Sequence, residues 1–275
     1  MKTLTKWNVV LLALTFAAGV RGQAVPGMYD TMAREFPNGS CSDSECFWTL
    51  DHLLTYYGVP LDEASLRRAL RDPRADVRSM AVDKLANDRG KEAIPWLAEA
   101  LSTERAAGTR LSLAMALGQL GDERGVAALE SLCMSGDQPD AARDVSVRYR
   151  ATNNLWTLHR SASVLCSIDL LRDLDRPGAP HGFGLRAAAM SLITVLDSLS
   201  EKQISTVREI SERWIFDEDA AVRRIASRAV EMYGDAGSPQ KLRAALPLEK
   251  DPMVRNAMEA ELKRLEARVQ HAPGK

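Results

Sequence analysis

The sequence is poor in aromatic residues, in histidine and in catalytic motifs. Phe, Trp and Tyr together make up 5% of the 275 residues, and there are four histidines. The sequence contains neither a glycine-rich phosphate loop nor a dinucleotide fingerprint. No Ser or Cys stands in a recognisable nucleophile motif. We therefore predict that the protein is not an enzyme, and nothing in the sequence calls for a cofactor or a metal ion.

An excess of charge of one sign is also lacking. The chain has 36 Lys and Arg against 37 Asp and Glu, which gives a formal net charge of −1. Proteins that bind nucleic acid typically concentrate positive charge on one face to neutralise phosphates. We therefore expect no nucleic acid among its partners.

Long apolar runs are absent as well. The run over residues 9–20 is too short for a membrane span, which needs about 20 residues. Lys2 and Lys6 precede this run, and Val20 and Gly22 offer small residues before Gln23, as in a secretory signal peptide. We expect cleavage after residue 22, no stable membrane insertion of the mature chain, and a secreted or periplasmic location. An uncleaved membrane anchor is the alternative.

An apolar residue followed by Arg recurs along the chain at intervals of 32 to 38 residues. The positions four and eight residues after the first member are apolar in every copy, and such spacing marks one face of a helix. Alanine fills the +4 position in four copies, which lets two helices approach closely. The pairs are Val77-Arg78, a weaker Thr109-Arg110, Val147-Arg148, Leu185-Arg186, Val222-Arg223 and Val254-Arg255.

A second apolar line follows in several copies, with Leu97, Leu129 and Leu242 each 20 residues after the start of their repeat. The glycines at 121 and 234 suit left-handed turns between two helices. Neither helix of such a hairpin buries its apolar face alone, but stacked hairpins share one core. The sequence therefore predicts an all-α solenoid of about five helix hairpins.

We expect the solenoid to span residues 70–269, between a helical cap over residues 23–69 and a loose tail over 270–275. The cap segment has seven acidic and three basic residues, and two helices are expected at 47–57 and 62–70, the second capped by Asp62. The last repeat has one helix, whose polar outer side suits the end of the array. We expect Glu261 to face solvent there.

The repeats resemble HEAT repeats, and especially the short bacterial HEAT-like units first grouped with phycobilisome lyase subunits. The segment from Asp72-Pro73 through Val77-Arg78 to Leu101 carries the resemblance most clearly. The family pattern implies an acid five residues before the apolar-Arg pair, which would cap the helix and pair with Arg in a ladder between units. Asp72, Glu104, Asp217 and Glu249 occupy this position, whereas Ala142 and Pro180 replace the acid in the third and fourth units.

An even number of cysteines in an exported chain suggests disulfides. We predict a disulfide between Cys41 and Cys46, which would close a short loop. Cys133 stands where other repeats have leucine, so it either pairs with Cys166 or is a buried thiol. A metal site of Cys41, Cys46 and His52 is a less favoured alternative, because the spacing matches no zinc motif.

Two functions remain open from the sequence. The first is a non-catalytic protein-binding scaffold whose partner is another exported protein or a peptide segment. The second, implied by the resemblance, is an enzyme or enzyme subunit related to bilin lyases, although a signal peptide argues against it. The repeated arginines suggest a structural ladder more than an anion-binding row. We expect the partner to bind near the centre, about residues 129–196, at His181, Phe183 and Trp156.

Overall fold

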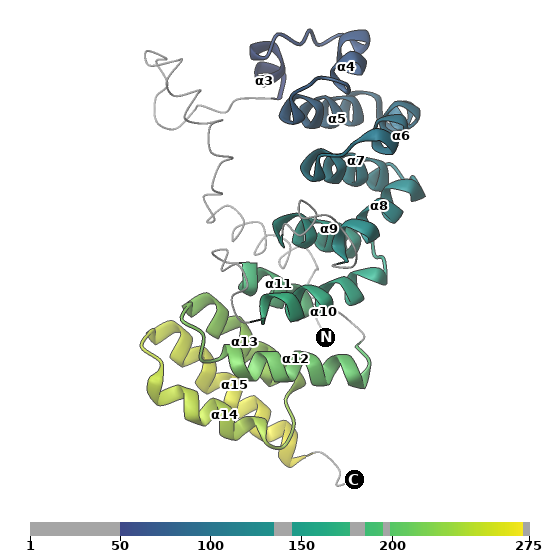
Figure 1. Cartoon of the computed structure of the whole chain (residues 1–275). Coiled ribbons are helices and arrows are strands. Elements are labelled where there is room, and N and C mark those ends of the chain that lie inside the picture. The colour runs from purple at the N-terminus through teal and green to yellow at the C-terminus, as the bar shows by residue number, and fades with distance from the viewer. Residues whose placement is uncertain (1–49, 135–144, 177–184, 195–198, 272–275) are drawn as a thin grey trace, which may run out of the picture. The chain divides into compact units, whose positions relative to one another are not determined.

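The computed structural model describes residues 50–134, 145–176, 185–194 and 199–271 (Figure 1). Every regular element in these ranges is a helix, so the predicted all-α architecture is confirmed. Residues 53–275 form one compact unit. The expected signal peptide and the Cys41–Cys46 disulfide lie outside the described residues.

Five helix hairpins follow one another along the described chain (Figure 1). Two short helices precede them, α3 (Leu50–Tyr56) and α4 (Glu63–Ala69), and α15 (Pro252–Gln270) follows them. The hairpins are α5 (Ala75–Arg89) with α6 (Ile94–Thr103), α7 (Ala107–Gln119) with α8 (Glu123–Cys133), α9 (Val145–Thr157) with α10 (Ala162–Leu174), α11 (Leu185–Ile193) with α12 (Glu201–Trp214), and α13 (Ala220–Tyr233) with α14 (Ser238–Ala245). Two 3-10 turns extend this pattern, η1 (Gly90–Ala93) before α6 and η3 (Leu246–Leu248) after α14.

Neighbouring hairpins pack side by side in chain order. The first helices α5, α7, α9, α11 and α13 contact one another in succession, and α15 packs on α13. Among the second helices, α8, α10, α12 and α14 pack in the same way, while α4 packs on α5. The described array is therefore a solenoid in which each hairpin covers the apolar face of the next.

The apolar positions predicted from the repeat form the core. All six residues at the +4 position are at most 1% exposed, from Ala81 in α5 to Met258 in α15. At the +8 position, five of six are fully buried, and Leu262 near the free end is partly exposed. Leu97, Leu129 and Leu242 of the second helices are also fully buried. The predicted register is confirmed for both helices of the hairpin.

The expected caps are confirmed at some helix ends and wrong at others. Asp72 and Glu104, which the resemblance implied as caps, precede the N-cap residues Arg74 and Ala106 of α5 and α7. The side chain of Asp62 accepts a hydrogen bond from the Ser65 amide at 2.9 Å, so the predicted cap of α4 is confirmed. Gly121 adopts the left-handed conformation after α7, with φ of 86°. The same expectation for Gly234 is wrong, because this residue is extended, with φ of −65°. The turn after α13 is closed instead by Asp235, whose carboxylate accepts from the Gly237 amide at 2.9 Å.

The expectation that Glu261 faces solvent is also wrong. Glu261 is 6% exposed, and its carboxylate accepts a hydrogen bond from the hydroxyl of Ser227 on α13. The position explains the burial: Val254, Met258, Glu261 and Leu265 are separated by four, three and four residues, and all four are buried on one face of α15. Burial raises the pKa of the Glu261 carboxyl above its ordinary value.

Candidate partner-binding surface

The two ends of the array carry the acid–arginine pairs that the repeat pattern implied. Arg78 donates from Nε and a terminal nitrogen to both oxygens of Glu104, at 2.7 and 2.9 Å. Arg223 holds Glu249 in the same bidentate way, at 2.6 and 2.7 Å. Each arginine thereby holds the linker that leads from its own hairpin to the next element, and bidentate pairs of this kind are strong and directional.

These pairs depress the pKa of the carboxyl groups. The hydrogen bonds from Arg223 lower the pKa of Glu249 to about 2, against the opposing effect of burial. Burial raises the pKa of Glu104, but the bonds and charge of Arg78 together with the backbone amides of Ala106 and Arg105 outweigh this effect, and the pKa is lowered. A third pair joins Arg186 to Asp217 at 2.7 Å. The acid-to-arginine ladder is thus confirmed between these units.

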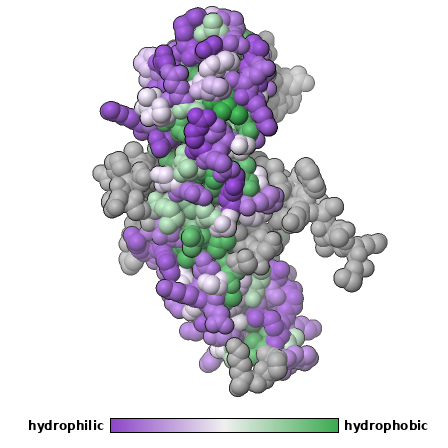
Figure 2. Space-filling model, turned by 90° about the vertical axis from the view of Figure 1, so that its right-hand side faces the viewer, coloured by the Kyte–Doolittle hydropathy of each residue, from purple (hydrophilic) through white to green (hydrophobic). Residues whose placement is uncertain are grey.

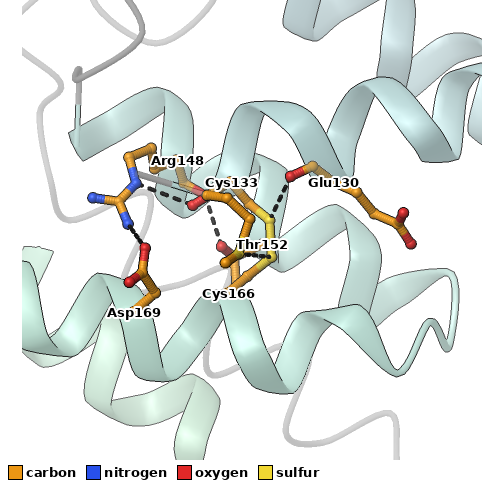
Figure 3. The surroundings of a disulfide bond; sticks show 7 residues. Glu130, Cys133, Arg148, Thr152, Cys166 and Asp169 are labelled. Carbon is orange, nitrogen blue, oxygen red and sulfur yellow. Dashed lines mark hydrogen bonds and ion pairs between the residues drawn. A yellow bond between two sulfur atoms is a disulfide. The ribbon is translucent and has the colours of Figure 1, made fainter. Parts of the chain in front are cut away.

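Arg148, in the third repeat, has a different set of partners. The ladder position of the following unit is Pro180, and Arg148 binds Asp169 at 2.8 Å and also Asp173, both on α10 of its own hairpin (Figure 3). Its Nε donates to the carbonyl oxygen of Cys133 at 3.0 Å. The guanidinium is 3% exposed, so a buried charge is neutralised within the hairpin rather than between hairpins.

A disulfide joins Cys133 at the end of α8 to Cys166 on α10, with 5.5 Å between the Cα atoms (Figure 3). This pairing was left open by the sequence, and the structure decides it against a buried free thiol. The sulfurs are buried, but the residue beside each cysteine is not: Met134 is 41% and Leu165 is 58% exposed. The bond therefore lies directly beneath exposed apolar side chains on two neighbouring second helices.

A groove of about 390 Å³ lies between α6 and α8. The backbones of these second helices approach each other at few points, unlike those of α8 and α10. Small side chains of α8 leave the space open. Figure 2 shows this side of the molecule, which lies at the right of Figure 1, with hydrophobic residues between hydrophilic ones. The lining residues are Ala98, Leu101, Ser102, Arg110, Arg124, Ala127, Ala128 and Ser131.

Two arginines give the groove its charge. Arg124 is 60% exposed and pairs with Asp122 at 2.6 Å. Arg110 is the ladder arginine of the second repeat, and the acid it would meet is replaced by Ala142. No carboxylate of the described residues pairs with Arg110, whereas Arg78, Arg148, Arg186 and Arg223 each bind at least one. The groove therefore has more positive than negative groups along its lining.

The residues predicted to bind a partner are not gathered at this groove. Trp156 is on α9, a first helix, and is partly exposed. His181 and Phe183 lie outside the described residues, so their role stays a prediction. Sequence reasoning missed the groove because Ala127, Ala128 and Ser131 look like ordinary helix residues. The one available signal was the replacement of the ladder acid by Ala142, which leaves Arg110 without its expected partner.

Within the described ranges, no group of three or more His, Cys, Asp or Glu residues is placed to hold a metal ion. The same ranges contain no helix with the length and apolar character that crossing a membrane requires.

Comparison with known proteins points to the repeat family. Residues 63–149, which include α4 to α8 and the start of α9, match a family model described as HEAT repeats. No curated protein matches the chain. The match supports HEAT repeats in general, and the closer likeness to lyase-type units stays an expectation.

Proposed function

We propose that the chain, whose residues 63–149 match HEAT repeats, is an exported, non-catalytic scaffold that binds another exported protein or a peptide segment. Stacked hairpins present a long continuous surface made by successive second helices, and such repeat arrays suit protein interaction. The fold by itself leaves the partner open, since similar folds serve many functions. The surface features of α6, α8 and α10 therefore carry the proposal.

The observation that supports it most is the exposed apolar surface beside the groove. The sulfur of Met134, which follows α8, lies 3.9 Å from that of Cys166, and the exposed Leu165 precedes Cys166 on α10, while the groove lies on the α6 side of α8. Exposed apolar side chains that gather next to a concave surface are typical of protein-binding sites. No observation on the described residues favours the alternative of an enzyme related to bilin lyases.

The disulfide supports the exported location. Disulfides between buried cysteines persist in oxidising compartments and are rare in reducing ones. The Cys133–Cys166 bond agrees with the signal peptide predicted from residues 1–22. N-terminal sequencing of material from the extracytoplasmic fraction tests this part: a chain that begins at Gln23 is expected, and one that begins at Met1 would contradict it.

The binding role is tested by capture from the protein's own extracytoplasmic fraction. Tagged wild-type protein is expected to retain one stoichiometric partner. Leu165→Glu should lose that partner, because a charge replaces an apolar contact. The matched control is Leu248→Glu in η3, where the side chain is 67% exposed at the other end of the array. Equal retention by both variants, or no stoichiometric partner with wild type, would refute the proposed surface.

A further inference from the structure

We propose that the groove between α6 and α8 binds a protein segment that presents a carboxylate beside an apolar side chain. The inference rests on the proposed scaffold function and names the chemistry of the partner at one site. It follows from three features of the described residues: the space between the helices, the character of the groove floor, and the missing partner of Arg110.

The space and the floor fit an apolar side chain. A volume of about 390 Å³ lies in the range of specific binding pockets. The floor is formed by Ala98 and Leu101 of α6 and by Ala128 of α8, and the exposed Ala127 lies on the wall. These methyl and isobutyl groups offer no hydrogen bonds, so an apolar group gains most by displacing water from them.

The charge at the groove calls for a carboxylate. Arg110 is half-buried and lines the groove next to Leu101 and Ser102. The equivalent guanidinium groups of Arg78 and Arg223 each hold a glutamate in a bidentate pair supplied by this chain. Arg110 occupies the same repeat position without a carboxylate among the described residues. A partner that brings one would complete the ladder at this unit.

Arg124 adds to the attraction. Its side chain is 60% exposed on the groove wall, and Asp122 neutralises it through bonds of 2.6 and 2.9 Å. With Arg110, Arg124 and Asp122 together, one positive charge is left over. This surplus steers an acidic segment to the groove and disfavours a basic one.

A second apolar surface lies near the groove. Ser131 at one end of the lining is three residues before Met134 along the chain. The sulfur of Met134 lies 3.9 Å from that of Cys166, and the exposed Leu165 precedes Cys166 on α10. A peptide with an acidic residue at Arg110 and apolar residues toward α10 would contact both surfaces.

The test is a selection of random dodecapeptides, displayed on phage, against the folded full-length protein. The enriched peptides are expected to share an acidic residue within a few positions of an apolar one. Each is then labelled, and its dissociation constant is measured by fluorescence anisotropy. Arg110→Gln is expected to weaken binding at least tenfold, and the matched control Arg224→Gln on α13 should change it less than twofold.

A second variant separates loss of binding from an effect of the Arg110 substitution on folding. Ala127 is exposed on the groove wall, so Ala127→Trp fills the groove without disturbing the core, and it should abolish binding at an unchanged melting temperature. Enriched peptides without a common acid, or peptides that bind both variants as well as wild type, would overturn the inference and leave the scaffold function standing. Failure to enrich any peptide also overturns it, and only the loss of the captured partner as well removes the proposed function.

Discussion

The repeated arginine has different hydrogen-bond partners in the end hairpins and in the central hairpin. In the first and fifth hairpins, Arg78 and Arg223 make the same bonds, to a glutamate in the linker that leaves their own hairpin and to two backbone carbonyls just before their own helix. In the third hairpin, Arg148 binds Asp169 and Asp173 of its own second helix. The repeated position is the same, but the arginine holds the linker to the next element at the ends and pairs with the second helix itself at the centre.

The difference shows that the connection between hairpins does not depend on one kind of bond. Arg110 has no carboxylate partner among the described residues at the joint between the second and third hairpins, and the Cys133–Cys166 disulfide links α8 to α10 at that same joint. At the following joint, Asp175 of α10 accepts from the indole nitrogen of Trp214 on α12 at 2.9 Å and also pairs with Arg213. A covalent bond and an indole-carboxylate contact thus occur where the ladder is interrupted.

The largest expected effect concerns the disulfide. Replacing both Cys133 and Cys166 by Ala should lower the free energy of unfolding by about 3 kcal/mol, because the bond closes a loop of 33 residues in the unfolded chain. Urea denaturation measures the change. The control is reductant, which should destabilise wild type but leave the double variant as it was. If the variant is as stable as oxidised wild type, the disulfide does not stabilise the central joint.

The ladder at the C-terminal end should contribute somewhat less. Glu249→Gln is expected to cost about 2 kcal/mol at neutral pH, since it removes the counter-charge of a largely buried guanidinium. The pKa of Glu249 is lowered from 4.5 to about 2 in the folded protein, so its contribution is present above pH 4.5 and is lost as the pH falls toward 2. The stability difference between wild type and variant, followed by denaturation across this range, should shrink accordingly. A difference independent of pH would contradict an ionic origin.

A smaller effect separates the turns after α7 and α9. Both end in the same bonding pattern, with Asp122 N bonded to Leu117 O and Arg160 N bonded to Leu155 O, but the left-handed residue is Gly121 in one and His159, with φ of 55°, in the other. Because a side chain strains the left-handed conformation, His159→Gly should raise the free energy of unfolding by about 0.5–1 kcal/mol. The reverse change, Gly121→Ala, should lower it by a similar amount. Calorimetry of both variants checks the pair, and loss of stability in His159→Gly would show that the imidazole makes a contact of its own.

The smallest effect on stability is expected at Arg110, whose ladder acid is replaced by Ala142. Arg110→Gln should change the free energy of unfolding by about 0.5 kcal/mol or less, because no carboxylate of the described residues is left without a partner. The urea midpoint of this variant, beside that of Glu249→Gln, gives the sharpest contrast between centre and end. A loss as large as that of Glu249→Gln would mean that Arg110 serves the fold and not a partner.

The sequence predicted the helical register because the spacing of apolar residues within each helix identifies its buried face. Ala81, Ala226 and Met258 were placed correctly for that reason, as was the cap at Asp62. The pairing of side chains from different helices was harder to predict, because it depends on positions that are distant in sequence. Arg148 with α10 and Cys133 with Cys166 are examples. Glu261 was misplaced because its polar side chain was weighed above its position on the buried face of α15.

The candidate surface was predicted least well. The sequence drew attention to the central loops and their departures from the repeat, including Ala142. It did not indicate that the replacement of the ladder acid by Ala142 affects the preceding hairpin, where Arg110 lines a groove. A groove arises from the distance between α6 and α8, which is set by packing on both sides. Small residues such as Ala127 reveal it only once the two helices are placed.

The disulfide also has a mechanical consequence. It ties two second helices together, whereas the adjacent pair α6 and α8 has no such tie among the described residues and makes few backbone contacts. The covalent bond fixes the distance between α8 and α10, whereas the distance between α6 and α8 is set by the packing of α7 on α5 and α6. Under a bending force, we expect the width of the groove to change more than the separation of α8 and α10.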